Sequence, residues 1–411
     1  MSHLLTRPTV RTEIREFLRL MVPLSSAHVA QAATGFVDTV MMGWLGQTEL
    51  AAGGLAAMTF TTFLITTTGI ITGISPLVAE AFGAGHHPRI QQLARQGLWL
   101  ALLIALPVML LLGHFDSVMR HLGQSELTLT TAQSYLDVMV WGFLPALAFA
   151  VLRNVVSALS QPRPVMVIVI AGTVLNGVGN YLFGFGHLGL PALGLPGIAL
   201  SSALCNWLML ACLLIYIFKH PELKTYRLFH GWRLEPLVLR ELVWLGLPIG
   251  VSFALEVGLF TITTYLMGAL GTEVLAAHQI VFQTIAVIFM VPLGMSDATT
   301  IRVGQWNGRQ DPSGVRRAAY VGMGLGGSFM TLMALVLLLF PQGAIALFLD
   351  IQNPDNAQVI SLAISMFGIA ALSQILDGVQ TTAAGALRGL KDTRIPMVLS
   401  LLAFWGMGLG S

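Results

Sequence analysis

The sequence predicts an all-α membrane protein made of two parallel repeats of six helices, with an N-terminal lobe over 1–225 and a C-terminal lobe over 226–411. Three observations support this prediction: the composition, the distribution of basic residues between alternate connections, and an internal repeat. Hydrophobic residues make up 55% of the chain and charged residues 10%, whereas about a quarter of the residues in ordinary soluble domains are charged. The composition therefore excludes a sizeable soluble domain.

Apolar runs of about 20 residues, the length needed to cross a bilayer, recur along the whole chain. Separated at their polar breaks, they predict spans near 17–43, 50–80, 94–113, 130–157, 164–186, 194–218, 237–268, 275–303, 316–341 and 358–387, with an eleventh from Ile395. The basic residues before the first run resemble the start of a signal peptide, but this run is too long and no cleavage site of small residues follows it. It is therefore predicted to be the first span.

Basic residues test this count, because connections on the cytoplasmic side of a membrane protein carry an excess of Lys and Arg. With the N-terminus inside, every Lys and Arg except Arg120 lies before or at the start of the first span, or in or beside an even-numbered connection. One missed or extra span would have placed basic residues on both sides of the membrane. We therefore expect a multi-pass protein of the bacterial inner (plasma) membrane with a cytoplasmic N-terminus.

A shift of 225 residues lays the second half of the chain on the first. It places Pro248 on Pro23 and Gly308 on Gly83, without a gap between them. Because six spans precede the second copy, both copies enter the membrane from the same side, which makes the repeats parallel. The second copy stops at Ser411, so we expect its fifth helix to be incomplete and its sixth to be missing from this chain.

Three of the acidic residues within predicted spans stand out, because a carboxylate facing the middle of a bilayer costs about 2.5–3.5 kcal/mol on insertion scales. Asp38 lies in the first span, Glu256 in the seventh and Asp377 in the tenth. None has a basic residue within reach on its own helix. Each could be held in a neutral structural hydrogen bond, but the lack of a compensating charge favours the alternative, a site for a cation such as sodium or a proton.

Polar residues on the same helix faces could support these carboxylates. Gln31 precedes Asp38 by seven residues, nearly two full turns, which puts both on one face. Gln374 and Gln380 lie three residues to either side of Asp377, where they could orient the carboxylate or help to bind an ion.

Three further polar residues have two interpretations each. Asn176 and Asn180 are one turn apart in the fifth span, and such a pair could bind an ion or only join helices. His278, near the start of the eighth span, could titrate near neutral pH or donate a structural hydrogen bond. Both alternatives stay open at this point.

The sequence lacks the motifs of several other classes of protein. It has no glycine-rich loop of the G-x-x-x-x-G-K-[ST] kind for nucleotide phosphates, no cluster of His and Cys at metal-ligand spacing and no nucleophile elbow. We therefore expect no enzyme activity, no resident cofactor, no nucleic-acid partner and no requirement for an ATPase subunit.

Five segments, taken together, carry a family resemblance. They are Gly35-Phe36-Val37-Asp38-Thr39, Pro76 to Gly85, Glu256 in its span, Ala276-Ala277-His278-Gln279, and Gln374-x-x-Asp377-Gly378-x-Gln380 with the following Gly385-x-x-Arg388-Gly389. The sequence in this way resembles the multidrug and toxic compound extrusion (MATE) family, and specifically its NorM-type branch. The resemblance covers nearly the whole chain. It implies twelve helices in two six-helix lobes, and antiport of cationic, often aromatic drugs against sodium or protons.

The resemblance also implies two sets of site residues. The coupling-ion carboxylates are Glu256 and Asp377, with a possible sodium ion between them, and the polar site of the N-terminal lobe consists of Asp38, Asn176, Asn180 and Ser202. NorM-type members often have a tyrosine four residues before the helix-ten aspartate, where this chain has Ser373. This departure leaves the choice between sodium and protons open.

The expected partners are small organic cations and the lipid bilayer, and the expected state is a monomer. One alternative is a flippase for lipid-linked oligosaccharides with the same architecture. It would need a basic cavity for a pyrophosphate, and three buried acids argue against it. A membrane-embedded transferase would need clustered catalytic residues in an interfacial loop, and the sequence shows none.

Overall fold

The computed structural model describes residues 9–115, 126–189, 191–231 and 233–407. In these ranges the regular structure is entirely helical, as the sequence predicts. Arg7, Arg120 and Ser411, which enter the predictions on orientation and on the end of the second repeat, lie outside the described residues.

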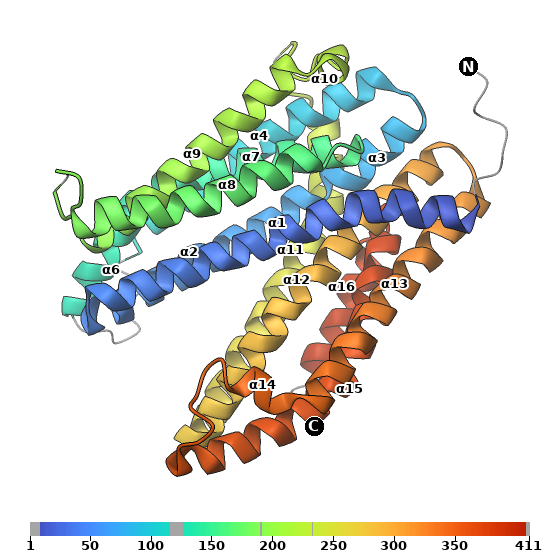
Figure 1. Ribbon diagram of the computed structural model, residues 1–411. Coiled ribbons are helices and arrows are strands. Elements are labelled where there is room, and N and C mark those ends of the chain that lie inside the picture. Colours follow the sequence, from blue (N-terminus) through green and yellow to red (C-terminus); the bar gives the residue numbers. More distant parts are fainter. Residues whose placement is uncertain (1–8, 116–125, 190, 232, 408–411) are drawn as a thin grey trace. The chain divides into compact units, whose positions relative to one another are not determined.

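The helices of the first repeat follow the predicted spans. They are α1 (Val10–Leu45), α2 (Gln47–Thr72), α3 (Ile74–Gly83), α4 (His87–Leu112), α6 (Glu126–Met139), η1 (Val140–Gly142), α7 (Phe143–Ala158), α8 (Arg163–Gly179), η2 (Asn180–Gly184), α9 (Leu195–Lys219) and the short α10 (Pro221–Thr225) (Figure 1). The second and fourth spans are each made of two helices, α2 with α3 and α6 with α7. The fifth continues from α8 into the π-helical turn η2.

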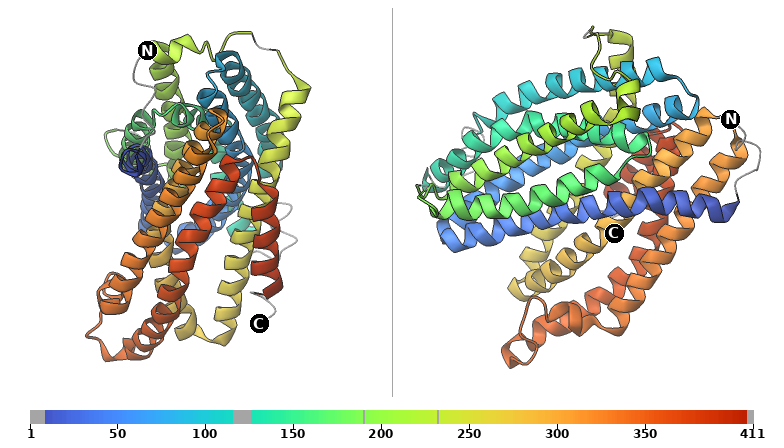
Figure 2. Two further views of the ribbon diagram at one scale, coloured as in Figure 1. Left: turned by 90° about the vertical axis from the view of Figure 1, so that its right-hand side faces the viewer. Right: turned by 45° about the horizontal axis from the view of Figure 1, so that its top comes forward.

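The helices of the second repeat are α11 (Pro236–Leu270), α12 (Thr272–Gly308), α13 (Pro312–Leu339), α14 (Pro341–Ile345), η3 (Pro354–Asn356), α15 (Ala357–Gly389), α16 (Arg394–Ser400) and η4 (Leu401–Met407). Both α12 and α13 pack along α15, and these three helices lie side by side in both views of Figure 2. A buried cluster that includes Ala277, Ile280 and Phe367 fills the contact between α12 and α15.

Among the described residues, nine helical stretches are long and apolar enough to cross a membrane. Helix α1 is not one of them, because polar side chains such as His28, Gln31 and Thr34 interrupt its apolar run. The nine stretches confirm the predicted class of an all-α membrane protein, while the role of α1 as the first span stays a prediction.

Equivalent positions of the two repeats adopt the same local structure. Gly46 joins α1 to α2 with φ 150°, and Gly271, which the 225-residue shift lays on it, joins α11 to α12 with φ 134°. Side chains with a Cβ rarely adopt these values. Glycine at both positions therefore allows each pair of long helices to be joined by a single residue.

Contacts divide the chain into two units. The central unit comprises Ala30–Ala254, and the terminal unit comprises Met1–Val29 with Leu255–Ser411. The division passes through α1 and α11, so that the first part of α1 packs in the terminal unit and the first part of α11 in the central unit. The predicted lobe boundary between 225 and 226 stays a prediction.

The first part of each repeat's opening helix is fitted closely against another helix of its unit. In the terminal unit, the Ser25 hydroxyl of α1 donates to the Val291 carbonyl of α12 over 3.0 Å, and a Cβ at Gly294 would collide with Ser25. In the central unit, a Cβ at Gly69 of α2 would lie 2.8 Å from the Cα of Gly250 in α11. The 225-residue shift lays Ser25 on Gly250 and Gly69 on Gly294, so the two crossings are equivalent.

Candidate functional site

In the central unit, Asp38 lies among polar side chains from two other helices. Its Oδ1 accepts a hydrogen bond from Asn180 Nδ2 over 2.6 Å, and its Oδ2 accepts one from Ser202 Oγ over 3.2 Å. Asn176 donates from Nδ2 to Ser202 Oγ over 2.8 Å. The structure thus brings together the four residues Asp38, Asn176, Asn180 and Ser202, which we call the Asp38 cluster.

Close packing of α8 against α9 holds the Asp38 cluster in place. The Ser201 hydroxyl donates to the Asn176 carbonyl over 2.9 Å, and a Cβ at Gly179 would collide with Ser201. Asn176 and Asn180 are 1% and 0% exposed, so their amide groups cannot exchange these partners for bulk water. The geometry is therefore fixed by the packing of the two helices.

The Asp38 cluster has the chemistry of a site for a small cation. Hard cations prefer oxygen ligands, and the buried Oδ1 of Asn180 makes no hydrogen bond in the structure. This oxygen and the Asp38 carboxylate come from different helices. Tyr135 and Cys205 also lie close enough to interact with the charge of Asp38.

Gln31 lies outside the Asp38 cluster. Its Oε1 accepts a hydrogen bond from Arg153 Nη1 over 3.2 Å. Seven helical residues put Gln31 and Asp38 on one face but separate them by about 10 Å along the axis. Gln31 therefore binds a buried arginine. Its position on the same helix face as Asp38 did not predict this contact.

In the terminal unit, Glu256 of α11 and Asp377 of α15 are both partly exposed. Among the described residues neither carboxylate makes a hydrogen bond or an ion pair, in contrast to Asp38. The charges that act on Glu256 are those of Arg388, which attracts it, and of Asp377, which repels it. The charge of Asp377 thus reaches Glu256, which places the two carboxylates close to one another.

The two glutamines that flank Asp377 differ in their surroundings. Gln374 is 0% exposed, and neither its Oε1 nor its Nε2 makes a hydrogen bond in the structure. Gln380 is exposed. Ser373, at the position where a tyrosine would be expected, donates to the Ala370 carbonyl of its own helix over 2.9 Å.

His278 has a local contact. Its Nε2 lies 3.3 Å from the Thr264 hydroxyl oxygen, and its ring stacks on Phe282 at 6.0 Å between centroids. Thr264 belongs to α11 and His278 to α12, so the pair links the two helices on either side of the Gly271 turn. This geometry fits the structural interpretation of His278.

The surroundings of Arg388 were not predicted from the sequence. The tenth span is predicted to end at residue 387, but α15 continues through Gly389. The charges of Asp297 and Glu256 both act on Arg388, and Asp297 Oδ2 lies 2.9 Å from His28 Nε2. Glu256 is therefore not isolated from basic residues, and only the tertiary structure could show this.

A buried ion pair in the terminal unit was also missed. Arg302 donates from Nε and Nη2 to the two carboxylate oxygens of Glu13 over 2.7 and 2.8 Å, and Trp306 Nε1 donates to Glu13 over 3.0 Å. Glu13 is 0% exposed. Its position among the basic residues at the start of α1 gave no sign of burial.

The fold and these clusters define a polytopic helical membrane protein with acidic residues placed inside its helical units. The model of the MatE family matches residues 23–182 and 248–410, which correspond to the two repeats. The chain is 52% identical to a probable multidrug resistance protein NorM of Synechocystis over 410 residues, which are 100% of this chain and 89% of the relative. It is 40% identical to one of Pseudomonas aeruginosa, covering 97% of this chain and 82% of the relative.

Solved structures share the fold. One is a MOP superfamily transporter from Pyrococcus furiosus, with a TM-score of 0.86 and 19% identity over 97% of this chain and 87% of that chain. Another is the eukaryotic MATE transporter AtDTX14, with a TM-score of 0.86 and 18% identity over 98% of this chain and 88% of that chain. The protein belongs to the MatE family. It is a multi-pass membrane transporter and not an enzyme.

Proposed function

We propose that this protein exports small organic cations, drugs among them, across the bacterial inner membrane in exchange for sodium ions or protons. The family and the relatives named for multidrug resistance support the substrate class. In this proposal the protein works as a monomer without an ATPase subunit, its N-terminus is cytoplasmic, and the coupling ion is its only cofactor.

The observation that carries the proposal is the relationship between Glu256 and Asp377. Two carboxylates that repel each other without hydrogen-bond donors in the structure are each stabilised when a cation binds between them or when one is protonated. Arg388 offsets part of the negative charge at Glu256. Because Asp297 shares that arginine, the pair still favours an added cation.

The Asp38 cluster differs from this pair because its carboxylate already accepts two hydrogen bonds. Such bonds orient the carboxylate and oppose the cost of burying its charge. We propose that Asp38, Glu256 and Asp377 all take part in binding the coupling ion.

The energy available matches such a cycle. A tenfold sodium gradient supplies about 1.4 kcal/mol, and each charge that moves through 100 mV adds about 2.3 kcal/mol. Entry of one or two cations can therefore drive the export of a drug against a modest concentration gradient.

The test is efflux of ethidium from cells that lack their own multidrug transporters. Cells with the wild-type protein should export the dye in a manner that depends on sodium or on external pH. Glu256→Gln and Asp377→Asn should each abolish this export at equal expression. The matched control is Glu273→Gln, because Glu273 is an exposed carboxylate at the start of α12 in the same unit. Unchanged efflux in the first two variants would refute the assignment of the coupling site.

The flippase alternative receives no support from the comparisons, because the family and the relatives are those of multidrug resistance proteins. Its requirement for a basic cavity is also not met by either acidic cluster. Dye efflux separates the two activities directly, since a flippase would leave ethidium inside the cells.

A further inference from the structure

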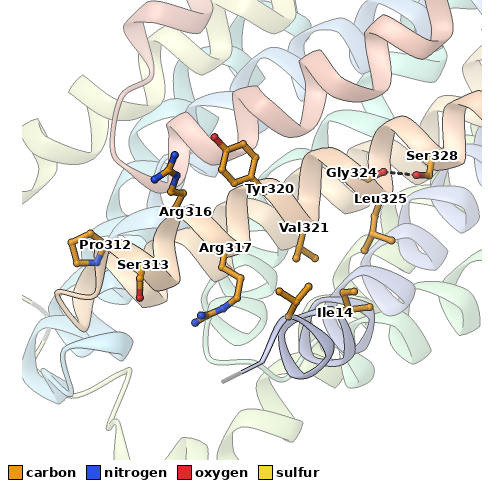
Figure 3. Close-up of a pocket in the computed structure, with 11 residues that line it drawn as sticks. Ile14, Pro312, Ser313, Arg316, Arg317, Tyr320, Val321, Gly324, Leu325 and Ser328 are labelled. Atoms are coloured by element: carbon orange, nitrogen blue, oxygen red, sulfur yellow. Dashed lines mark hydrogen bonds between the residues drawn. The ribbon is translucent and has the colours of Figure 1, made fainter. Parts of the chain in front are cut away.

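A groove of about 970 Å³ opens in the terminal unit between the start of α1 and the first half of α13 (Figure 3). It lies away from Glu256 and Asp377, neither of which lines it. Its lining changes along α13, with arginines near the start of this helix and apolar or small residues further on. The two ends of the groove therefore suit different parts of one amphipathic ligand.

The basic end consists of Arg316 and Arg317. The exposed Arg316 lies with its guanidinium carbon 5.8 Å from the centre of the Tyr320 ring, and Arg317 lies 5.3 Å from that of Trp306. Two nitrogens of Arg317, Nε and Nη2, are shielded from solvent and make no hydrogen bond in the structure. A buried charge without a partner is costly, so the negative charge of an anion in the groove beside Arg316 and Arg317 would be stabilising.

The acidic residues nearby do not satisfy these donors. The charge of Asp311 acts on Arg317, but its Oδ1 accepts the backbone N–H groups of Ser313 and Gly314 over 3.0 and 3.1 Å at the start of α13. Glu13 is paired with Arg302. The arginine end of the groove is therefore positively charged.

The other end of the groove is apolar. Val10 and Ile14 of α1 and Val321 and Leu325 of α13 line it. Leu325 lies eight residues beyond Arg317, about 12 Å further along the helix. At Gly324 a Cβ would meet no atom within 4 Å, so the groove is open there. Because α13 is one of the nine candidate spans, this end lies at the depth of the acyl chains.

We propose that this groove binds an anionic phospholipid. The phosphate lies at Arg316 and Arg317, and an acyl chain lies along Gly324 toward Leu325. Basic pockets beside spanning helices are known to hold anionic headgroups. The lipid comes from the leaflet on the arginine-rich side, which the predicted orientation makes the cytoplasmic one. It would fasten α13 to the start of α1.

The test uses thermal unfolding of the purified protein in detergent with added lipid. A ligand that binds only the folded state raises the midpoint in proportion to RT ln(1 + [L]/Kd). Phosphatidylglycerol should raise the midpoint of the wild-type protein more than phosphatidylcholine at the same concentration. Inorganic phosphate at that concentration should have little effect, because it lacks the acyl chain. Equal shifts with both lipids, or a full shift with phosphate alone, would overturn the proposal.

Two variants separate the headgroup from the acyl chain. Arg316→Gln/Arg317→Gln should lose most of the difference between phosphatidylglycerol and phosphatidylcholine. Gly324→Leu adds an apolar side chain where a Cβ meets no atom within 4 Å, and it should weaken the shift by both lipids because it occupies the apolar end. Its midpoint without lipid should not fall, since leucine favours helix over glycine. This variant therefore tests the groove even if the double variant folds poorly.

The matched control is Lys219→Gln/Lys224→Gln, which removes two exposed basic residues from the same predicted side of the membrane but from the central unit. It should respond to both lipids as the wild-type protein does. A loss of selectivity in this control as large as in the arginine variant would show that general surface charge, and not the groove, attracts the lipid.

Discussion

Arg302 donates two hydrogen bonds, of 2.7 and 2.8 Å, to the carboxylate of Glu13, although 289 residues separate the two in the chain. The pair fastens the first turn of α1 to the last turns of α12. A second ion pair near the start of a long helix lies in the central unit, where Glu235, just before α11, pairs with Arg95 of α4, although the 225-residue shift does not lay one pair on the other. Each repeat's opening helix is thus anchored by an acidic residue at its start.

Breaking the Glu13–Arg302 pair on one side should destabilise the protein strongly. Arg302→Met leaves a buried, uncompensated carboxylate and should cost about 3–5 kcal/mol, whereas Glu13→Leu/Arg302→Met should cost less than the single change. Thermal unfolding in detergent measures both variants. A double variant that is no more stable than Arg302→Met would show that the arginine matters for its packing on Trp306 and not for the ion pair.

Removing the shorter hydrogen bond to Asp38 should impair transport more than removing the longer one. Asn180→Ala deletes the donor at 2.6 Å, and Ser202→Ala deletes the donor at 3.2 Å. A hydrogen bond to a charged group contributes about 1.5–3 kcal/mol, so Asn180→Ala should show the larger fall in stability and in ethidium efflux. The reverse order would mean that Ser202 positions the carboxylate.

The buried amide of Gln374 should lower the stability of the folded protein. Its buried amide makes no hydrogen bond in the structure, and an unsatisfied polar group costs about 1–3 kcal/mol. Gln374→Leu should therefore raise the unfolding midpoint when it is measured without sodium, in choline chloride. If Gln374 helps to bind the coupling ion, the variant should also lose the extra stability that sodium chloride or low pH gives the wild-type protein. A lower midpoint of this variant in choline chloride would contradict the inference that the Gln374 amide lacks a hydrogen-bond partner.

Asp311 should make the start of α13 sensitive to acid. Hydrogen bonds from the Ser313 hydroxyl and the Gly314 N–H hold the pKa of Asp311 below its ordinary value of 3.8. A depressed pKa contributes stability that is present above 3.8 and is lost as the pH falls through the folded-state value. Asp311→Ala should thus lower the midpoint at pH 7 and reduce its dependence on pH below 4. A pH profile identical to that of the wild-type protein would rule this contribution out.

The close crossing of α2 and α11 should not tolerate a methyl group. A Cβ at Gly246 would collide with the Ile70 backbone carbonyl, and overpacking of this kind costs about 1–3 kcal/mol. Gly246→Ala should lower the unfolding midpoint and the efflux rate. Gly54→Ala is the control within α2, because a Cβ there meets no atom within 4 Å. Equal midpoints for the two variants would show that the helices can move apart freely.

The sequence was most informative where the physics is local. Hydropathy over 20 residues placed the spans, because each spanning helix must satisfy its own backbone hydrogen bonds in the membrane. The Asp38 cluster was identified from the family resemblance, and the structure places its four residues in contact. The burial of Glu13 could not be predicted, because a carboxylate between arginines at a helix start has the pattern of an exposed residue.

By itself, therefore, the sequence determined the helical membrane class, the repeat of 225 residues, the family and the identity of the acidic residues within the spans. Only the tertiary structure decided which polar side chains interact: Arg388 with Glu256, Arg302 with Glu13, and Arg153 with Gln31. The reason is that these pairs join residues over 100 positions apart. Their contacts depend on how the helices are rotated and how deeply they are packed, and a hydropathy pattern along one helix does not contain that information.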